Sequence, residues 1–292
     1  MNHPWLLLLV LAGSAACRQV QEEPPAGPEA SLEAAADGRG EPAPLPDAGP
    51  EPSAEPELPE PELPELVPEP VAEPEPVAEP ETDEAIPPAP THYYGRRIAK
   101  TMHWSGAEWL LRETRENEEH ASRLLEALAV QPGQAVCDLG CGNGFHTLKL
   151  AELVGPEGTV YAVDIQQPML KMLEERARET GVENVVPLLA TAVDPGLAPG
   201  SCDLILLVDV YHELSHPEET LARVREALKP DGRLVLVEFR AEDPAVKIKR
   251  LHKMSKEQIL TELVPNGFRL VEEFDELPMQ HVMFFQRDDA PR

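Results

Sequence analysis

Short apolar segments alternate with amphipathic helical segments over residues 116–285, and this alternation constrains the fold more than any other feature. The periodicity predicts helices over residues 116–130, 145–154, 168–180, 217–228 and 255–264. It predicts strands over residues 135–139, 159–163, 185–189, 203–208, 233–239, 268–274 and 281–285. Strand–helix alternation of this kind requires a mostly parallel sheet that is covered by helices on both faces.

The last two predicted strands differ from the others because no helix lies between them. The link that joins them runs through Pro278 and is too short for a crossover helix. Two strands joined in this way pair antiparallel. The predicted fold class is therefore α/β, a doubly wound, seven-stranded and mostly parallel sheet that ends in an antiparallel hairpin.

The first 92 residues have a different composition from the rest of the chain. Residues 18–92 hold 20 of the 33 prolines, and their 20 acidic and two basic side chains account for −18 of the net charge of −28. Such a segment cannot bury enough apolar surface to offset its ordering entropy, so we expect a disordered acidic linker. Residues 93–292 then form one domain, with 93–115 as an N-terminal lid. The acidic balance argues against nucleic acid as a partner.

The extreme N-terminus has the features of an export signal. An eight-residue apolar run, Trp5 to Ala12, is too short to span a bilayer and is followed by small residues and then Cys17. This arrangement resembles a bacterial lipoprotein signal over residues 1–17, which implies membrane attachment through a lipidated Cys17. We therefore expect the cell envelope, facing the periplasm, as the location. The location would be the cytoplasm if the signal is not processed.

A glycine-rich loop joins the first predicted strand of the domain to the next helix. It reads DLGCGNG over residues 138–144, and Asp164 ends the following strand. In an open α/β sheet, ligands bind beyond the carboxyl ends of the strands, where this loop lies. The third glycine comes one residue earlier than in the dinucleotide-binding fingerprint, and Asp138 would repel a pyrophosphate. A cationic or zwitterionic ligand suits the loop better.

These motifs resemble those of the class I S-adenosylmethionine-dependent methyltransferases, over about residues 116–287. The resemblance implies a Rossmann-like methyltransferase fold with S-adenosylmethionine as the methyl donor. It implies that Asp138, Gly140, Gly142 and Gly144 hold the methionine end of the donor. It also implies that Asp164 accepts hydrogen bonds from the ribose hydroxyls, with Ile165 next to it.

Further positions follow from the same resemblance. Thr191 and Ala192 stand where the family contacts the adenine, and Asp194 is a weaker candidate for that contact. Asp209 follows the fourth predicted strand, where the family places a residue facing the methyl donor. Its carboxylate could attract the positive sulfonium or orient an acceptor.

Residues 212–216 read HELSH, which matches the zinc-protease pattern H-E-x-x-H. That pattern needs both histidines on one helix, whereas Pro217 favours a helix start and disfavours helical backbone at His216. We therefore expect His212 and His216 on a loop and at a helix entrance, and we predict no metal site. Metal binding by these residues within a methyltransferase stays open.

The segment after the fourth strand is the best place for chemistry on a methyl acceptor. We expect Tyr211 or His212, with Asp209, to orient or deprotonate it. The predicted function is methyl transfer to a small-molecule acceptor, and the oligomeric state is left open. A binding module without turnover and a dehydrogenase are the alternatives. The glycine spacing and the lack of a Tyr-x-x-x-Lys pair after strand four argue against a dehydrogenase.

Overall fold

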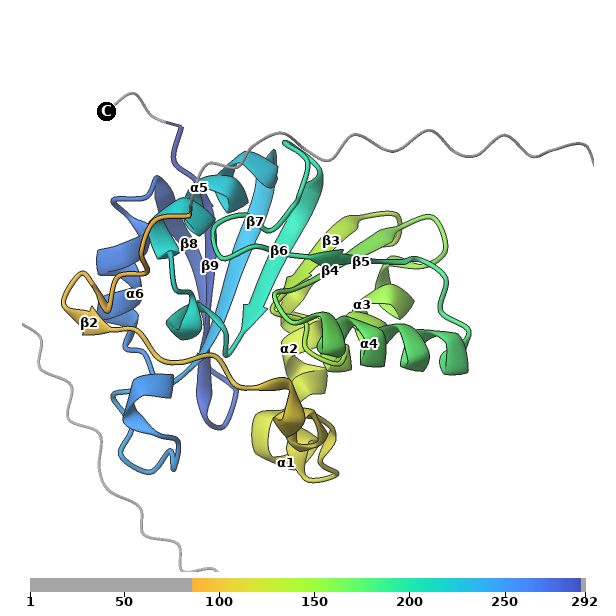
Figure 1. Ribbon diagram of the computed structural model, residues 1–292, viewed down its shortest axis with the longest axis horizontal. Coiled ribbons are helices and arrows are strands. Elements are labelled where there is room, and N and C mark those ends of the chain that lie inside the picture. Colours follow the sequence, from red (N-terminus) through yellow and green to blue (C-terminus); the bar gives the residue numbers. More distant parts are fainter. Residues whose placement is uncertain (1–85, 290–292) are drawn as a thin grey trace, which may run out of the picture. The chain divides into compact units, whose positions relative to one another are not determined.

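A computed structural model describes residues 86–289 of the chain (Figure 1). The predicted signal over residues 1–17, and the predicted linker up to residue 85, lie outside the described residues. Within residues 86–289, no helix combines the length and the apolar character needed to cross a membrane. Within the described residues, contacts with the domain already occur before residue 93, because the Pro87 carbonyl accepts a hydrogen bond from His216 Nε2 at 2.8 Å.

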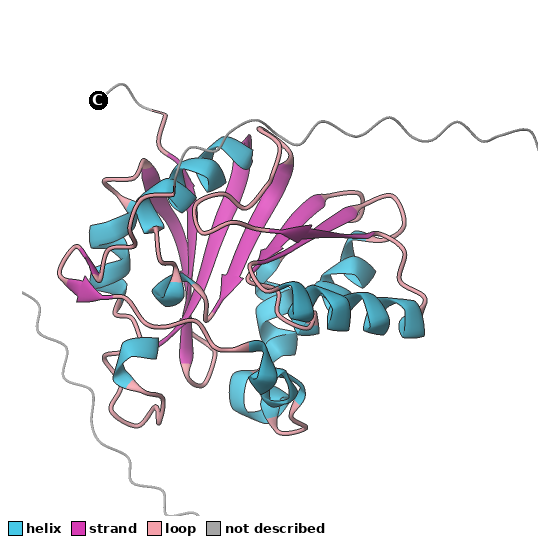
Figure 2. Cartoon of the chain, viewed as in Figure 1, coloured by secondary structure: helices cyan, strands magenta, loops and turns pink. Residues whose placement is uncertain are grey.

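A seven-stranded sheet forms the centre of the domain, with the strand order β5-β4-β3-β6-β7-β9-β8 (Figure 2). The strands β3 to β7 are parallel, whereas β9 pairs antiparallel with both β7 and β8. Their bounds are β3 (Ala135–Leu139), β4 (Thr159–Asp164), β5 (Val185–Leu189), β6 (Cys202–Val208), β7 (Leu228–Phe239), β8 (Phe268–Phe274) and β9 (Gln280–Arg287). The predicted doubly wound α/β fold with its antiparallel end is confirmed.

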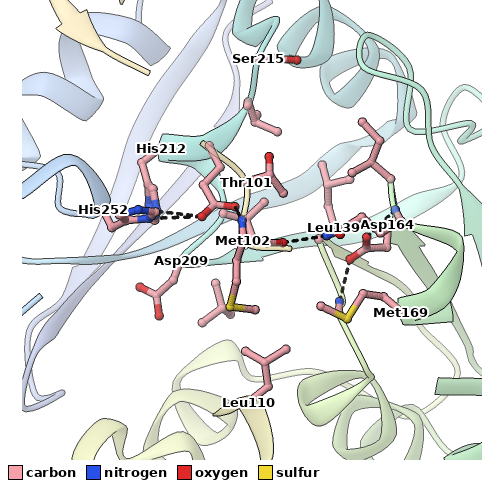
Figure 3. A pocket seen from close by; sticks show the side chains of 18 of the residues that line it. Thr101, Met102, Leu110, Leu139, Asp164, Met169, Asp209, His212, Ser215 and His252 are labelled. Carbon is pink, nitrogen blue, oxygen red and sulfur yellow. Dashed lines mark hydrogen bonds and ion pairs between the residues drawn. The ribbon is translucent and has the colours of Figure 1, made fainter. Parts of the chain in front are cut away.

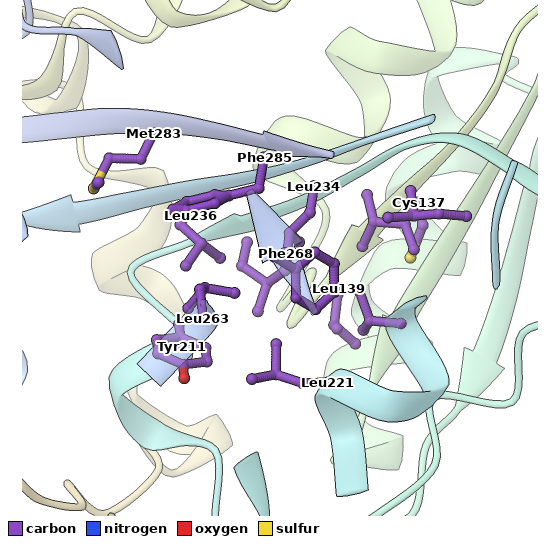
Figure 4. Close-up of a cluster of buried hydrophobic side chains, with 14 of the residues drawn as sticks. Cys137, Leu139, Tyr211, Leu221, Leu234, Leu236, Leu263, Phe268, Met283 and Phe285 are labelled. Atoms are coloured by element: carbon purple, nitrogen blue, oxygen red, sulfur yellow. The ribbon is translucent and has the colours of Figure 1, made fainter. Parts of the chain in front are cut away.

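Each face of the sheet packs against its own helices, because neighbouring residues of a strand point to opposite faces. On one face, Val235 and Val237 of β7 join the apolar side chains of α2 (Ala121–Leu128) and α3 (Phe145–Val154). On the other face, Leu234 and Leu236 pack with α5 (Pro217–Ala227) and α6 (Lys256–Leu263) (Figure 4). The helix α4 (Gln167–Thr180) packs against α3 and β4. A sheet covered in this way is held rigidly on both sides.

One predicted helix is wrong in its length. The predicted helix 116–130 is two helices, α1 (Arg115–Glu119) and α2, with His120 between them in the left-handed region at φ 51°. The buried Glu119 carboxylate, which lies just before this break, forms ion pairs with Arg112 and Arg115, at 2.6 and 2.7 Å. The Arg112 pair joins α1 to the segment before it, whereas the Arg115 pair has the ordinary i, i+4 spacing of a helix.

The remaining elements are short. The strands β1 (His92–Tyr93) and β2 (Arg96–Arg97) form a separate two-stranded sheet. The described residues also contain three 3₁₀ helices, η1 (Trp104–Leu111), η2 (Tyr211–Glu213) and η3 (Arg250–His252). η1 precedes α1, η2 follows β6, and η3 follows β7. These turns matter because they carry side chains to the carboxyl ends of the parallel strands.

Candidate functional site

A cavity of about 550 Å³ opens at the carboxyl ends of β3, β4 and β6 (Figure 3). Its size is within the usual range for small-molecule sites, and its position is the expected one for an open α/β sheet. One end contains Gly140, Gly142 and Asp164, and we call it the glycine-loop end. The other contains His212, Glu213 and His252, and we call it the histidine end.

The glycine loop needs glycine for two separate reasons. Gly140 has φ +79°, and a Cβ there would lie 2.5 Å from Val210 Cγ2, so the loop and the segment after β6 approach too closely for a side chain. Gly142 has φ +54°, and a Cβ there would lie 2.8 Å from Leu110 Cδ1. Gly144 does not line the cavity, because it packs on Leu173 of α4 at the start of α3. Its role here is helix packing.

Asp164 ends β4 with its carboxylate facing the cavity. Its Oδ2 accepts a hydrogen bond from the Gly142 N–H at 2.9 Å, and its Oδ1 accepts one from the Gln166 N–H at 2.8 Å. Burial raises the pKa of Asp164, although these N–H groups oppose the shift. Each oxygen keeps a second lone pair, so the carboxylate can accept two further hydrogen bonds from a ligand.

Asp138 lies beneath the loop and outside the cavity wall. Its Oδ2 accepts a hydrogen bond from Thr147 Oγ1 at 2.6 Å. Burial raises the pKa of Asp138 to about 6. The side chain therefore ties β3 to α3, and contact with a ligand would require an intervening group.

Asp209 is the most unusual residue of the cavity. It follows β6 at φ 55°, a left-handed conformation that is costly for a residue with a Cβ. Its Oδ2 accepts a hydrogen bond from Gln280 Nε2 at 2.9 Å, but the buried Oδ1 has no partner among the described residues. Burial raises its pKa well above the usual value. A strained carboxylate with a free buried oxygen is suited to a cationic ligand.

Ile165, Thr191 and Ala192 also line the cavity. Ile165 is 48% exposed, which is unusual for an aliphatic residue and leaves its side chain free to cover a flat ligand. The Thr191 hydroxyl accepts a hydrogen bond from the Asp194 N–H at 3.0 Å, so it shapes the loop after β5. Asp194 itself lies outside the cavity wall and is near Arg223, at 3.7 Å.

The segment before α1, predicted as a lid, runs along the cavity. Met102 and Trp109 line the wall, and Arg115 reaches it from α1. Gln166 holds this segment through two hydrogen bonds. Its Nε2 donates to the Met102 carbonyl at 2.9 Å, and its Oε1 accepts from the Trp104 N–H at 2.8 Å. These bonds therefore attach the lid to Gln166, whose own N–H binds Asp164.

At the histidine end, His212 is almost completely buried and faces the cavity. Its Nδ1 lies 2.6 Å from Oε2 of Glu238, a fully buried carboxylate on β7. Burial alone would lower the pKa of His212, but the charge and the hydrogen bond of Glu238 raise it above the usual value. The ring is thus held in one orientation, with Nε2 toward the cavity.

Tyr211 does not share this position. Its ring belongs to the apolar core on the α5 and α6 side (Figure 4), and its hydroxyl donates to Glu262 Oε2 at 2.9 Å. Burial raises its pKa well above the usual value. We therefore leave Tyr211 out of the candidate acceptor site, because its hydroxyl cannot reach the cavity from this position.

Two further residues line the histidine end, Glu213 of the H-E-x-x-H motif and His252 of the polar segment after β7. The Glu213 carboxylate accepts a hydrogen bond from the Met102 N–H at 3.2 Å, and the His252 Nδ1 lies 3.1 Å from His212 Nε2. His252 comes from η3, forty residues after His212, and only the path of the chain after β7 brings it here. Lys247 and Lys249 line the cavity from the same loop. No spacing signal in the sequence connects these positions.

The H-E-x-x-H segment is divided between two environments, as its proline predicts. His212 lies in η2, whereas His216 precedes α5 and has Pro217 as the first helical residue. His216 Nδ1 contacts Ser215 Oγ, and its Nε2 binds the Pro87 carbonyl. His216 therefore anchors the N-terminal segment, and the zinc-protease arrangement of the two histidines is absent from this part of the chain.

A family profile described as a methyltransferase domain matches residues 131–279, a little over half of the chain. The nocamycin O-methyltransferase of Saccharothrix syringae is 35% identical over 116 residues, which are 40% of this chain and 41% of that enzyme. The ubiquinone/menaquinone biosynthesis C-methyltransferase UbiE of Pseudomonas fluorescens is 30% identical over 169 residues, 56% of this chain and 65% of that enzyme. The chain thus spans about 41 to 65% of the length of these two relatives.

The fold is also that of a solved structure. A SAM-dependent methyltransferase from Aquifex aeolicus superposes with a TM-score of 0.61 at 23% identity, covering 64% of this chain and all of that one. The superposition shows the fold, and the profile match over residues 131–279 shows that the chain belongs to the methyltransferase domain family.

Proposed function

We propose that this protein transfers a methyl group from S-adenosylmethionine to a small-molecule acceptor. The observation that carries the proposal is the pair of strand-end acids, Asp164 and Asp209, which face one cavity across the glycine loop. S-adenosylmethionine has a positively charged sulfur, an ammonium group and two ribose hydroxyls. These groups match carboxylates that still have free acceptor oxygens.

The residues of the glycine-loop end fit this donor. Asp164 would accept hydrogen bonds from the two ribose hydroxyls through its free lone pairs. The unpartnered Asp209 Oδ1 would face the positive charge, which offsets the cost of burying a carboxylate. Gly140 and Gly142 would hold the methionine part, and Ile165, Thr191 and Ala192 would hold the adenine. Asp138 and Gly144 would act by shaping the loop from beneath it.

The donor supplies a methyl group that is already activated, so the protein's main task is to position the two reactants. His212 is the residue best placed to orient an acceptor, since Glu238 fixes its ring with Nε2 toward the cavity. Lys247 and Lys249 would favour an acceptor that carries negative charge. The two relatives are named as a nocamycin O-methyltransferase and a ubiquinone/menaquinone biosynthesis C-methyltransferase, which supports the class of acceptor.

Titration calorimetry with S-adenosylmethionine tests the donor site. Asp164→Asn is expected to weaken binding about 10- to 100-fold, because a neutral amide cannot accept strong hydrogen bonds from both hydroxyls. Asp231→Asn removes an exposed carboxylate on β7 and should leave affinity unchanged. Binding of NAD alone would support a dehydrogenase and contradict the proposal.

Turnover separates an enzyme from a binding module that has kept only the pocket. Labelled S-adenosylmethionine incubated with cell-envelope and small-molecule extracts should yield a labelled product and S-adenosylhomocysteine. His212→Ala should abolish the product with donor affinity intact. Tight donor binding without product from any extract would favour the binding module.

We also propose that the N-terminal residues place the domain at a membrane. Support comes from the apolar run before Cys17 and from the acidic, proline-rich segment after it, which would act as a spacer. Mass spectrometry of the expressed protein should find a lipid on Cys17, and Cys17→Ser should release the protein from membranes, unlike Ser53→Ala. An intact, unmodified N-terminus in the soluble fraction would overturn the tether without affecting the enzyme.

A further inference from the structure

Three side chains at the histidine end, from two separate segments, point to one another. Figure 3 labels the two histidines of this group, His212 and His252. His212 Nε2 lies 3.1 Å from His252 Nδ1 and 3.8 Å from Glu213 Oε1. The remaining pair, His252 Nδ1 and Glu213 Oε1, is 3.2 Å apart. Two imidazole nitrogens and one carboxylate oxygen therefore form a small triangle at the wall of the cavity.

The triangle has the size that a small divalent ion requires. Ligand atoms at about 2.0–2.2 Å from a tetrahedral ion are about 3.3–3.6 Å from one another. The three separations, 3.1, 3.2 and 3.8 Å, lie around that value. An ion would thus need only small movements of the side chains, and two imidazoles with one carboxylate are a common set of zinc ligands.

Hydrogen bonds from neighbouring residues also fix the positions of two of the three side chains. Glu238 is fully buried and accepts from Nδ1 of His212, which leaves Nε2 with its lone pair toward the triangle. A carboxylate on the other ring nitrogen is the usual support of a metal-binding histidine. The Met102 N–H holds Glu213 through Oε2, the oxygen that the triangle does not use. Both supports fix the ligands before any ion binds.

We propose that His212, Glu213 and His252 bind a divalent transition-metal ion, with zinc as the best match. All three residues line the cavity, so the remaining coordination position faces the space for the acceptor. Three protein ligands with one open position are typical of zinc sites that take part in reactions, whereas structural zinc sites have four protein ligands.

One consequence rests on the proposed methyl transfer. An acceptor hydroxyl or thiol bound at the open position would have a lowered pKa and would lose its proton to solvent. Its lone pair would then form the bond to the methyl carbon as the carbon–sulfur bond breaks. The electron pair of that bond would stay on sulfur, giving S-adenosylhomocysteine. His212 would orient the acceptor through the ion.

The full chain, freed of metal by dialysis against a chelator, tests the site by calorimetric titration with Zn²⁺. We expect one ion per chain, and Mg²⁺ should bind far more weakly because it prefers oxygen ligands. His252→Ala should weaken Zn²⁺ binding at least about 100-fold. His92→Ala removes an exposed histidine outside the cavity and should change nothing. Zn²⁺ binding that is absent, or unaffected by His252→Ala, would overturn the proposal.

Two further measurements show whether the three side chains bind a metal ion or only form hydrogen bonds with one another. Glu238→Gln should weaken Zn²⁺ binding about 10- to 100-fold, as expected for a residue that supports a ligand. Co²⁺ in place of Zn²⁺ should give visible absorption bands that disappear in Glu213→Gln. Neither measurement needs the methyl donor. A protein that binds Zn²⁺ but no S-adenosylmethionine would therefore keep this proposal and lose the proposed function.

Discussion

The glycine-loop end and the histidine end of the cavity are built in different ways. At the glycine-loop end, Gly140, Gly142 and Asp164 directly follow two neighbouring strands, and backbone N–H groups hold the carboxylate. At the histidine end, His252 comes from a loop far along the chain, and the buried Glu238 of β7 orients His212. The first arrangement depends on local spacing. The second depends on how distant segments meet.

The two ends of the cavity should therefore tolerate different kinds of amino-acid substitution. The glycine-loop end is constrained by backbone conformation, so that even a methyl group disturbs it. The histidine end is constrained by side-chain chemistry, so that shape-preserving substitutions there should fold and lose only their ligand. Four predictions test this contrast, from the largest expected effect to the smallest.

Gly140→Ala should be the most damaging change. The new Cβ meets Val210, and alanine is strained at φ +79°, so we expect a loss of about 2–4 kcal/mol in the free energy of unfolding and loss of donor binding. Gly133→Ala is the matched control, at φ +82° with nothing within 4 Å, and should cost about 1 kcal/mol. Denaturant unfolding measures both. Equal costs would mean that the close approach to Val210 is unimportant.

Asp138→Asn should raise the free energy of unfolding at pH 7 by on the order of 2 kcal/mol. Burial raises the pKa of this carboxyl from 3.8 to about 6, so the folded state binds its proton more tightly than the unfolded state does. The free energy of unfolding of the wild type therefore falls as the pH rises from about 4 to about 6, and the variant should lose this component of the pH dependence. The Thr147 hydroxyl can still donate to the amide oxygen.

Unfolding curves measured between pH 4 and pH 7 check this prediction. Donor affinity is expected to fall in the same variant, because a negative charge is removed from beneath the loop. A variant that is less stable than the wild type at pH 7 would show that the carboxylate is needed for the fold.

Gln166→Ala should cost about 1 kcal/mol and affect both ends of the cavity. It removes the two hydrogen bonds that fix the lid beside Met102 and Trp104. Amide hydrogen exchange should rise over residues 100–105, with weaker binding of donor and acceptor. Gln131→Ala, at an exposed position before β3, is the control. Unchanged exchange in the lid would show that other contacts hold it.

Lys247→Ala and Lys249→Ala should have the smallest effect. Both side chains are exposed, and such charges contribute less than about 1 kcal/mol. We expect an unchanged stability, unchanged donor affinity and a few-fold rise in KM for an anionic acceptor. Higher salt should reduce the difference from the wild type. An effect on donor binding would mean that the two ends are coupled.

Much of the fold could be predicted because each element carries its own pattern. β3, α3 and β5 have the predicted bounds, and the strand ends place Gly140, Asp164 and Asp209 at one edge of the sheet. The helix predicted over 116–130 is divided at His120, whose left-handed backbone conformation is not visible in the helical periodicity. Tyr211 and His212 are adjacent in sequence, yet the η2 turn sends one to the core and the other to the cavity.

The sequence by itself determined the class of fold, the glycine loop and the acids at the strand ends, because strand ends and short turns depend on nearby residues. Only the tertiary structure decided which partners these residues have. It joined His252 and Glu238 to His212 and placed His216 against Pro87. It also buried Asp209 Oδ1 where no residue between 86 and 289 bonds to it. Such contacts join segments tens of residues apart, and their free energy depends on packing that no local pattern records.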